Sequence, residues 1–351
     1  FERSANRQLP EARSRAFRDG PLSKGVALFD LRTLMESLTR APHTTSFEVL
    51  PPRRPELAPR FWSNVDQLLA SRPDFISVTY GAGGTDRQSA GDVVAKLVRD
   101  TPVRPIAHLT CVATTRADVR EMVEEYLDLG VRTFMALRGD NPRGTPDWRP
   151  GPGDVRSASE LVTLMRQIEI ERTARSAGNA LRSAFKPLTI AVAAFPAGNP
   201  VAGTTPEQEA ERLLTKQAAG ASFGVTQLFW DPQQYSQFVN LCRSIGVTIP
   251  IVAGLLPPTD PRRVRRMQEL TGVVPPDWLL SALESAETPE EAAARGISLG
   301  RKIAREVLAA GSPGIHVYTF NQAGPALDLV RDLHAPDPNQ EAFPAPIREE
   351  Q

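Results

Sequence analysis

Polar residues stand at the ends of several short apolar runs, and their types are suited to acid–base or redox chemistry. Glu48 is the clearest case, because it lies within the apolar segment TTSFEVL, where an unpaired carboxylate is expensive to bury. Desolvation predicts a raised pKa for Glu48 and therefore a proton donor. A structural ion pair with Arg53 or Arg138 would account for the same residue, and the sequence leaves both interpretations open.

A second carboxylate, Asp140, follows Arg138 in the segment ALRGDNP. It could lie beside a charged or redox-active ligand, or form a solvated Arg–Asp pair. His108 ends another apolar run, where a single histidine is more often a satisfied core residue than a ligand. The four histidines show no spacing typical of metal ligands, so we expect no metal.

The glycine-rich segment Gly81–Gly84 resembles the start of a dinucleotide fingerprint. Asp86 occupies the place of the third glycine, so the fingerprint is incomplete. The glycines could let the backbone approach a phosphate, or they could only form a strand–helix turn. Neither a P-loop nor a GxSxG nucleophile motif occurs in the chain.

The elements that must position these residues repeat in a regular order. Eight short apolar runs without strict alternation, each followed by a segment of helical spacing, are typical of parallel strands buried on both faces. Eight such units predict an α/β fold, a closed (β/α)8 TIM barrel, with a doubly wound open sheet as the alternative. The runs are Thr45–Leu50, Phe75–Tyr80, Pro105–Thr110, Arg132–Leu137, Leu188–Phe195, Val225–Phe229, Pro250–Leu255 and Ile315–Phe320.

Three regions follow from this pattern. Residues 1–40 form an N-terminal extension with one amphipathic helix over residues 28–37, residues 41–334 form the catalytic barrel, and residues 335–351 form a flexible tail. An extra pair of helices is expected at about residues 276–283 and 290–308, before the eighth strand. The basic insertion at residues 172–187 is expected on the surface, without a catalytic role.

Functional residues of such a barrel lie at the C-terminal ends of its strands. We therefore expect one convergent pocket formed by the residues that end the runs. These residues are Glu48, Thr79, His108, Arg138, Asp140, Phe195, Gln227, Pro257, Tyr318 and Asn321.

Composition excludes several classes of protein. The 351 residues contain 41 Lys+Arg and 41 Asp+Glu, and this balance excludes nucleic-acid or membrane binding through bulk charge. No apolar run approaches the length of a membrane span. Cys111 and Cys242 form no CxxC pair, which fits a reducing compartment, and we expect a cytoplasmic protein.

Eight motifs, in order along the chain and with similar spacing, resemble the catalytic domain of the methylenetetrahydrofolate reductase family, bacterial type. The resemblance extends from about Thr44 to Leu333. No single motif is decisive, but eight in register are hard to obtain by chance. They are SFEVLPPR, FISVTYGAGG, AHLTC, ALRGDNP, AAFPAGNP, KQAAGASFGVTQLFWD, GLLPPTDP and HVYTFN.

This resemblance implies a specific activity. Members of the family bind FAD at the C-terminal strand ends of a (β/α)8 barrel. They reduce 5,10-methylenetetrahydrofolate to 5-methyltetrahydrofolate, with NADH or NADPH as the hydride donor. The product supplies methyl groups for methionine synthesis. The nicotinamide and the folate use the same flavin face in turn, with ping-pong kinetics. The family commonly forms dimers or tetramers, so we expect a homo-oligomer.

The resemblance also assigns roles to residues. Glu48 is similar to the general acid, and Asp140 to a carboxylate near the flavin that also contacts the folate. Gln227 matches the amide that orients folate and nicotinamide, and Thr79 matches a nicotinamide-nucleotide contact. Pro257 and Gln322 fall among the folate-binding positions. The residues that fall on positions similar to the FAD-binding positions of the family are Tyr80, Ala82, His108, Arg138, Gly139, Asp140, Ala158, Phe195, Asn199, Glu209, Arg212 and Lys216.

Three of these FAD positions belong to one helix. Glu209, Arg212 and Lys216 are spaced i, i+3 and i+7, so they share a helix face. A cation there could meet the pyrophosphate of FAD while a carboxylate meets a ribose. The spacing alone would equally suit a solvated patch of charges.

Some positions depart from the family pattern. Phe195 and Asn199 stand where some members have Tyr and His, so the hydrogen bonds to the flavin are expected to differ. Pro261 replaces a stacking aromatic residue, and Gln322 stands where an Arg can meet the folate tail. These changes concern substrate affinity more than reaction type.

Two other functions remain open from the sequence. One is a related barrel flavoprotein, similar to proline dehydrogenase, with another substrate. The other is a non-catalytic module that binds folate or flavin. The joint presence of Glu48, Asp140 and Gln227 favours catalysis. No residue pattern distinguishes NADH from NADPH.

Overall fold

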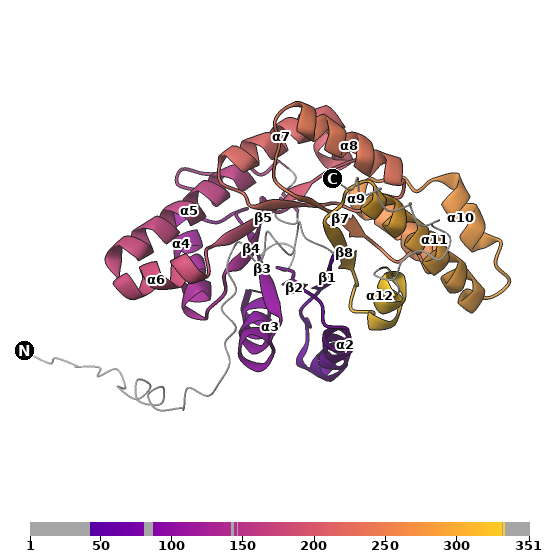
Figure 1. Ribbon diagram of the computed structural model, residues 1–351, viewed down its shortest axis with the longest axis horizontal. Helices are drawn as coiled ribbons and strands as arrows, with labels where there is room; N and C mark the ends of the chain where they lie inside the picture. Colours follow the sequence, from indigo (N-terminus) through magenta and orange to yellow (C-terminus); the bar gives the residue numbers. More distant parts are fainter. Residues whose placement is uncertain (1–42, 81–86, 142–143, 146, 332, 334–351) are drawn as a thin grey trace, which may run out of the picture.

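The computed structural model describes residues 43–80, 87–141, 144–145, 147–331 and 333. Eight parallel strands form a closed barrel in the order β1 to β8, which confirms the predicted (β/α)8 fold over the open-sheet alternative (Figure 1). The strands are β1 Thr44–Val49, β2 Phe75–Val78, β3 Arg104–Thr110, β4 Thr133–Leu137, β5 Thr189–Ala194, β6 Phe223–Thr226, β7 Ile251–Leu255 and β8 Gly314–Tyr318.

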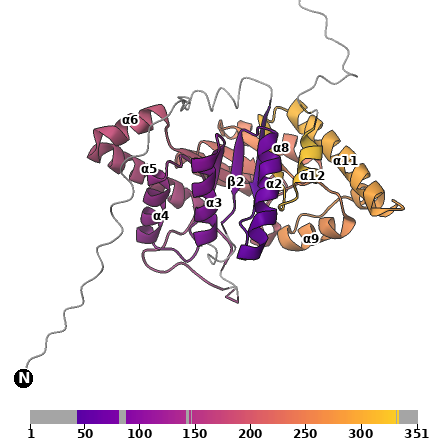
Figure 2. The same cartoon turned by 90° about the horizontal axis from the view of Figure 1, so that it is seen from below.

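Helices surround the barrel, and α2 and α3 cover the strands on the side seen in Figure 2. The predicted extra pair before the last strand is confirmed as α10 and α11. The helices are α2 Ala58–Ala70, α3 Arg87–Asp100, α4 Arg116–Asp128, α5 Ala158–Arg175, α6 Ala177–Phe185, α7 Pro206–Ala218, α8 Pro232–Ser244, α9 Pro261–Thr271, α10 Asp277–Glu284, α11 Pro289–Ala309 and α12 Ala323–Val330, with 3-10 turns η1 Pro55–Leu57 and η2 Pro200–Ala202.

Short sequence signals start several helices directly after the strand ends. Thr205 accepts a hydrogen bond from the backbone of Gln208, whose side chain in turn accepts one from the backbone of Thr205, so the two form a capping box at α7. Asp231 and Asp260 cap α8 and α9, and each is followed by a proline at the first helical position. These caps hold the loops at the C-terminal end of the barrel close to their strands.

Alternation along the strands separates two cores. One set of apolar side chains packs the strands against the helices, and it includes Phe47, Ile76 and Phe134. A smaller set that includes Phe75, Ile106 and Met135 fills the inside of the barrel. Successive side chains of a strand point to opposite faces. The residues two positions after Phe75, Ile106 and Met135, nearer the C-terminal ends of the strands, therefore also face the barrel interior.

One predicted strand was misplaced. The sixth run was expected over residues 225–229, whereas β6 ends at Thr226. Leu228, Phe229 and Trp230 lie in the following loop but are nevertheless buried. Apolar side chains that fill the space beneath the loop therefore extended the apparent strand.

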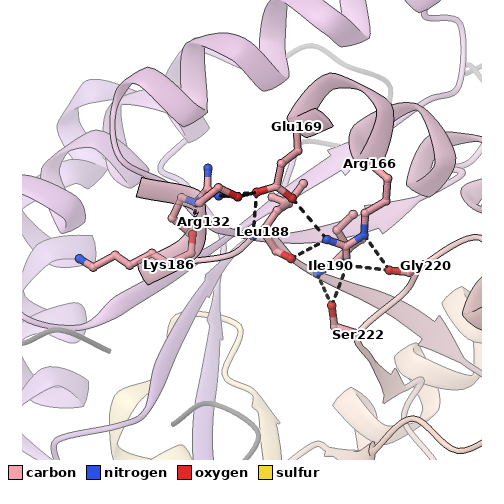
Figure 3. Close-up of polar contacts among 9 residues, drawn as sticks. Arg132, Arg166, Glu169, Lys186, Leu188, Ile190, Gly220 and Ser222 are labelled. Carbon is pink, nitrogen blue, oxygen red and sulfur yellow. Dashed lines mark hydrogen bonds and ion pairs between the residues drawn. The ribbon is translucent and has the colours of Figure 1, made fainter. Parts of the chain in front are cut away.

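The basic insertion is mostly helical. Helix α5 continues to Arg175, and residues 177–185 form α6. Helix α5 contributes Arg166 and Glu169 to a polar network at the N-terminal end of the barrel (Figure 3). Arg166 donates to the carbonyl oxygens of Leu188 (2.6 Å) and Gly220 (2.7 Å) and to Ser222 Oγ (3.0 Å). These bonds attach α5 to the segments that enter β5 and β6.

Glu169 occupies the centre of the same network and is only 14% exposed. Its Oε1 accepts hydrogen bonds from Arg132 Nη2, from Ser183 Oγ at 2.6 Å and from the Leu188 amide at 3.1 Å (Figure 3). A cavity of about 380 Å³ lies beside it, lined by α6 and by the C-terminal end of α4. Because the chain enters the strands here, this cavity lies at the opposite end from the predicted pocket.

The remaining predictions about domains stay untested. The N-terminal helix at residues 28–37, the glycine-rich segment 81–84 and the tail 335–351 all lie outside the described residues. No described helix combines the length and the apolarity that crossing a membrane requires.

Candidate active site

The closed barrel brings the predicted strand-end residues to one rim. All eight strands are parallel, so their C-terminal ends share one end of the barrel. Glu48, His108 and Tyr318 lie within β1, β3 and β8, while the other predicted strand-end residues follow their strands. The rim carries, in barrel order, Glu48, Thr79 with Tyr80, His108, Arg138 with Asp140, Phe195 with Asn199, Gln227, Pro257 and Gln322.

Glu48 lies between two buried histidines. Its Oε2 is 3.7 Å from His108 Nε2 on β3 and 3.7 Å from His316 Nε2 on β8. The two rings are 7% and 1% exposed, whereas the carboxylate is 18% exposed and is accessible from the rim. The alternative left open by the sequence, an ion pair of Glu48 with Arg53 or Arg138, is not present among the described contacts, and two histidines lie beside the carboxylate instead.

Two serines inside the barrel hold the histidines in place. Ser77 Oγ is 2.6 Å from His108 Nε2, and Ser46 Oγ is 2.8 Å from His316 Nδ1. Ser46 and Glu48 are two positions apart on β1, so both face the interior. The interior of the barrel therefore contains a compact polar layer above its apolar core.

The predicted pKa of Glu48 was wrong in direction. Burial alone raises the pKa of Glu48, as expected from its apolar strand. The contact with His316 and the charges that His108 and His316 carry when protonated outweigh burial and leave the pKa of Glu48 below its ordinary value. The sequence did not reveal this, because the two histidines are 60 and 268 residues away along the chain.

Burial also affects His108 itself. Desolvation lowers the pKa of His108 to about 4, although the charge of Glu48 opposes this shift. At neutral pH the ring is therefore uncharged, and it can hydrogen-bond with Ser77. The prediction that His108 is a satisfied core residue is consistent with this, but its place beside Glu48 adds a role in shaping the site.

Tyr318 completes this side of the pocket. Its hydroxyl donates to the Thr226 carbonyl oxygen at 2.5 Å, and its ring meets His316 edge-on at 5.3 Å. A Cβ at Gly254 would lie 2.7 Å from this hydroxyl, so only glycine leaves room for it. Burial raises the pKa of Tyr318 well above its usual value, and the phenol remains protonated.

The turn after β4 presents Arg138 and Asp140 to solvent. Gly139 between them has φ 84°, and a Cβ there would lie 2.8 Å from Val112 Cγ1. No ion pair joins Arg138 to Asp140 among the residues described. The solvated Arg–Asp pair considered from the sequence is thus not formed, and both side chains are available to a ligand.

The charged helix face of α7 is not a solvated patch. Glu209 is 2% exposed and accepts hydrogen bonds from Thr204 Oγ1 and from Arg212 at 2.8 Å. Lys216 Nζ donates to the Ala193 carbonyl oxygen at 2.8 Å and lies 5.8 Å from the centre of the Phe195 ring. Burial lowers the pKa of Lys216 to about 8, and the charge of Glu209 only partly offsets this.

The other predicted positions are placed as follows. Gln227 Oε1 accepts a hydrogen bond from the Leu228 amide at 2.8 Å, which fixes its side chain. Asn199 caps η2 through the Ala202 amide, and Ala158 is the first residue of α5. Pro257 is buried in the loop after β7. Ala82 lies outside the described residues.

Arg263 is a rim residue that the sequence analysis missed. Its Nη1 donates to Gln322 Oε1, and its guanidinium lies 4.9 Å from the centre of the Phe320 ring. Phe320 and Asn321 have positive φ values of 47° and 58°, and the Asn321 side chain bonds both backbone groups of Leu50. This turn places Gln322 within reach of α9, a contact without a local sequence signal.

The positions that resemble FAD-binding residues lie together on one half of the rim. They lie on or directly after β2 to β5, which are consecutive in the barrel, and on α5 and α7. Lys216 provides a half-buried amine there whose charged form an anion would stabilise. No cluster of three metal-ligating side chains occurs among the described residues.

Comparisons with known proteins identify the family to which the chain belongs. Residues 33–334 match the family profile of methylenetetrahydrofolate reductase. A 5,10-methylenetetrahydrofolate reductase of Pectobacterium carotovorum subsp. carotovorum is 30% identical over 281 residues, which cover 79% of this chain and 86% of that protein. The protein of the same name from Escherichia coli (strain K12) is 29% identical, with the same coverage.

A plant relative and a solved structure extend these comparisons. A probable methylenetetrahydrofolate reductase (NADH) of Oryza sativa subsp. japonica is 31% identical, over 82% of this chain and 48% of that protein. An uncharacterized Clostridium thermocellum protein that binds two copies of 5-methyl-5,6,7,8-tetrahydrofolic acid shares the fold, with a TM-score of 0.57, 12% identity, and coverage of 84% of this chain and 97% of that one. On the extent of the profile match and of the bacterial relatives, the chain belongs to the methylenetetrahydrofolate reductase family.

Proposed function

We propose that this protein reduces 5,10-methylenetetrahydrofolate to 5-methyltetrahydrofolate, with FAD as bound cofactor and NADH or NADPH as hydride donor. The observation that carries this proposal is the carboxylate of Glu48, held on the barrel interior at the rim of a member of this family. FAD, when bound, would accept a hydride from the nicotinamide and pass it to the folate, each in turn at the same site.

The residues of the chain would have distinct tasks in this reaction. Lys216 would hold the pyrophosphate, and Arg138 with Gly139 would border the flavin. Gln227 would orient the folate, since its Oε1 is bonded to the backbone and no described residue bonds its amide Nε2. Glu48 would supply the proton that opens the five-membered ring of the folate, because water is a poor donor at neutral pH.

A simple experiment tests this function. The purified protein, reconstituted with FAD, should keep its flavin absorbance after gel filtration. NADH or NADPH should bleach it anaerobically, and methylenetetrahydrofolate should restore the colour. Loss of the absorbance on gel filtration would contradict the cofactor, and absence of bleaching would favour a passive binding module. Reoxidation by proline-pathway compounds instead of the folate would favour the proline-dehydrogenase-like alternative.

Arg263 should contribute to folate affinity. It lies where α9 meets Gln322, the residue that replaces an Arg of other members, so its guanidinium can meet the acidic tail of the folate. Arg263→Gln should raise the KM for methylenetetrahydrofolate about tenfold, equivalent to ~1.4 kcal/mol, with little change in flavin reduction. Steady-state and stopped-flow kinetics measure the two effects.

A neighbouring arginine is the matched control. Arg262 is 92% exposed and pairs only loosely with Asp260, at 3.6 Å. Arg262→Gln should therefore leave the KM unchanged. Equal effects of the two substitutions would mean that general surface charge, and not the position of Arg263, attracts the folate.

A further inference from the structure

The cavity at the N-terminal end of the barrel is lined by more positive than negative side chains. It has a volume of about 380 Å³, within the range of small-molecule pockets, and lies between α6 and the C-terminal end of α4. The charged side chains of its lining are Asp128, Arg132, Glu169, Arg172, Arg182 and Lys186. Both carboxylates are already paired, Asp128 with Arg172 and Glu169 with Arg132. Two cations therefore remain without a carboxylate in the cavity.

These two cations are Arg182 and Lys186. Arg182 Nη2 donates to Asn179 Oδ1 at 2.8 Å, which is a neutral acceptor, and no carboxylate among the described residues pairs with either cation. Burial lowers the pKa of Arg132, and the charges of Arg172 and Arg182 add to this shift. The guanidinium groups therefore lie close enough to repel one another, and an anion in the cavity would relieve this repulsion.

Part of the cavity lining is apolar. Leu181 and Phe185 of α6 line it and are 60% and 49% exposed, and α6 buries none of its residues. The two side chains are four positions apart, so they share one helix face, and Leu127 of α4 lines the cavity with them. The ring of a ligand placed here would remove this apolar surface from water. The cavity therefore suits an anion that carries an apolar body.

We propose that this cavity binds a phosphate monoester with an aromatic ring, the phosphate between Arg182 and Lys186 and the ring against Leu181 and Phe185. A phosphate monoester carries a charge of about −1.5 to −2 at neutral pH, which matches two unpaired cations better than a single carboxylate does. The planar fork of an arginine also suits a phosphate, because it can donate two parallel hydrogen bonds to its oxygens.

The proposed site is independent of the proposed function. It lies at the opposite end of the barrel from the rim, so it requires neither a flavin nor a folate. Lys186 lies shortly before β5, and its carbonyl oxygen accepts a hydrogen bond at 2.6 Å from Nε of Arg132, the residue before β4. A ligand that holds Arg182 and Lys186 would therefore link α6 to the entry of these two strands. It would bind only the folded chain and should raise the Tm.

Isothermal titration calorimetry of the full chain with 1-naphthyl phosphate tests the proposal. FAD is present throughout, so that a phosphate site at the rim is occupied. We expect one saturable site that binds this probe about tenfold or more tightly than 1-naphthol, which lacks the phosphate, and than inorganic phosphate, which lacks the ring. Neither NAD⁺ nor 5-methyltetrahydrofolate should displace the probe, and the probe should raise the Tm in calorimetry.

Substitutions at the two unpaired cations locate the site. Arg182→Gln and Lys186→Gln should each weaken binding of 1-naphthyl phosphate about tenfold, because each removes a charge-assisted hydrogen bond. Arg175→Gln is the matched control, since Arg175 is 62% exposed, pairs with Glu124 and Glu171 and does not line the cavity. It should leave the affinity unchanged. Circular dichroism checks that each variant is folded.

Three results would overturn the proposal. If Arg175→Gln weakens binding as much as Arg182→Gln, general surface charge attracts the probe. If NAD⁺ or 5-methyltetrahydrofolate displaces the probe, it binds at the rim. If the probe does not bind at all, the cavity is no phosphate site, and a Tm that rises with protein concentration would then assign Leu181 and Phe185 to a contact between copies of the chain. Failure to retain FAD contradicts the proposed function instead, and the same titration without FAD still tests the cavity.

Discussion

Glu48→Gln should separate the two halves of the proposed reaction. Reoxidation of the flavin by methylenetetrahydrofolate should fall by ~10²-fold or more, the scale of a lost general acid, whereas reduction by NADH or NADPH should stay within roughly tenfold of the native rate. Ring opening of the folate requires a proton at N10, but hydride transfer from the nicotinamide does not. Gln keeps the size and much of the hydrogen bonding of Glu48, so the surroundings should be retained.

Stopped-flow absorbance of the flavin measures the two steps separately. Tyr318, the neighbour of Glu48 on β8, offers a matched control. Tyr318→Phe removes only a hydroxyl that is already bonded to the Thr226 carbonyl oxygen. It should slow reoxidation far less than Glu48→Gln. If Glu48→Gln slows both steps equally, or neither, the carboxylate is a structural partner of the two histidines.

Glu169→Gln should lower the free energy of unfolding more than the removal of a carboxylate from the solvent side of α5. The substitution leaves Arg132 and Arg166, which are 20% and 29% exposed, without their common carboxylate (Figure 3). Removing one partner of a buried ion pair costs 3–5 kcal/mol, and partial exposure reduces this to about 2 kcal/mol. The Tm should fall by roughly 3 °C, measurable by calorimetry.

Glu171→Gln on the same helix is its control. Glu171 pairs with Arg120 and Arg175 on the solvent side of α5, so its removal should lower the Tm much less. Because Glu169 lies at the opposite end of the barrel from the rim, the kinetics of folded Glu169→Gln should remain native. Equal Tm values for the two variants would show that the network does not anchor the strands.

The fold and the rim of the site could be predicted from the sequence. Parallel strands buried on both faces appear as short apolar runs, and helices between them have their own period, so eight units in order indicate a closed barrel. Closure places every strand end at one rim, and for that reason Glu48, Asp140 and Gln227 could be grouped without coordinates. The end of β6 was misjudged because burial under a loop produces the same apolar pattern as a strand.

The electrostatic state of Glu48 was decided only by the tertiary structure. Its local sequence is apolar and predicts a raised pKa, but β1 closes the barrel against β8, which brings His316 of a segment 268 residues away to the carboxylate. The contact of Arg263 with Gln322 likewise depends on how α9 lies beside the turn after β8. Periodicity reports which face of a strand is buried, whereas a pKa depends on charges across a few ångströms, and only chain closure determines those neighbours.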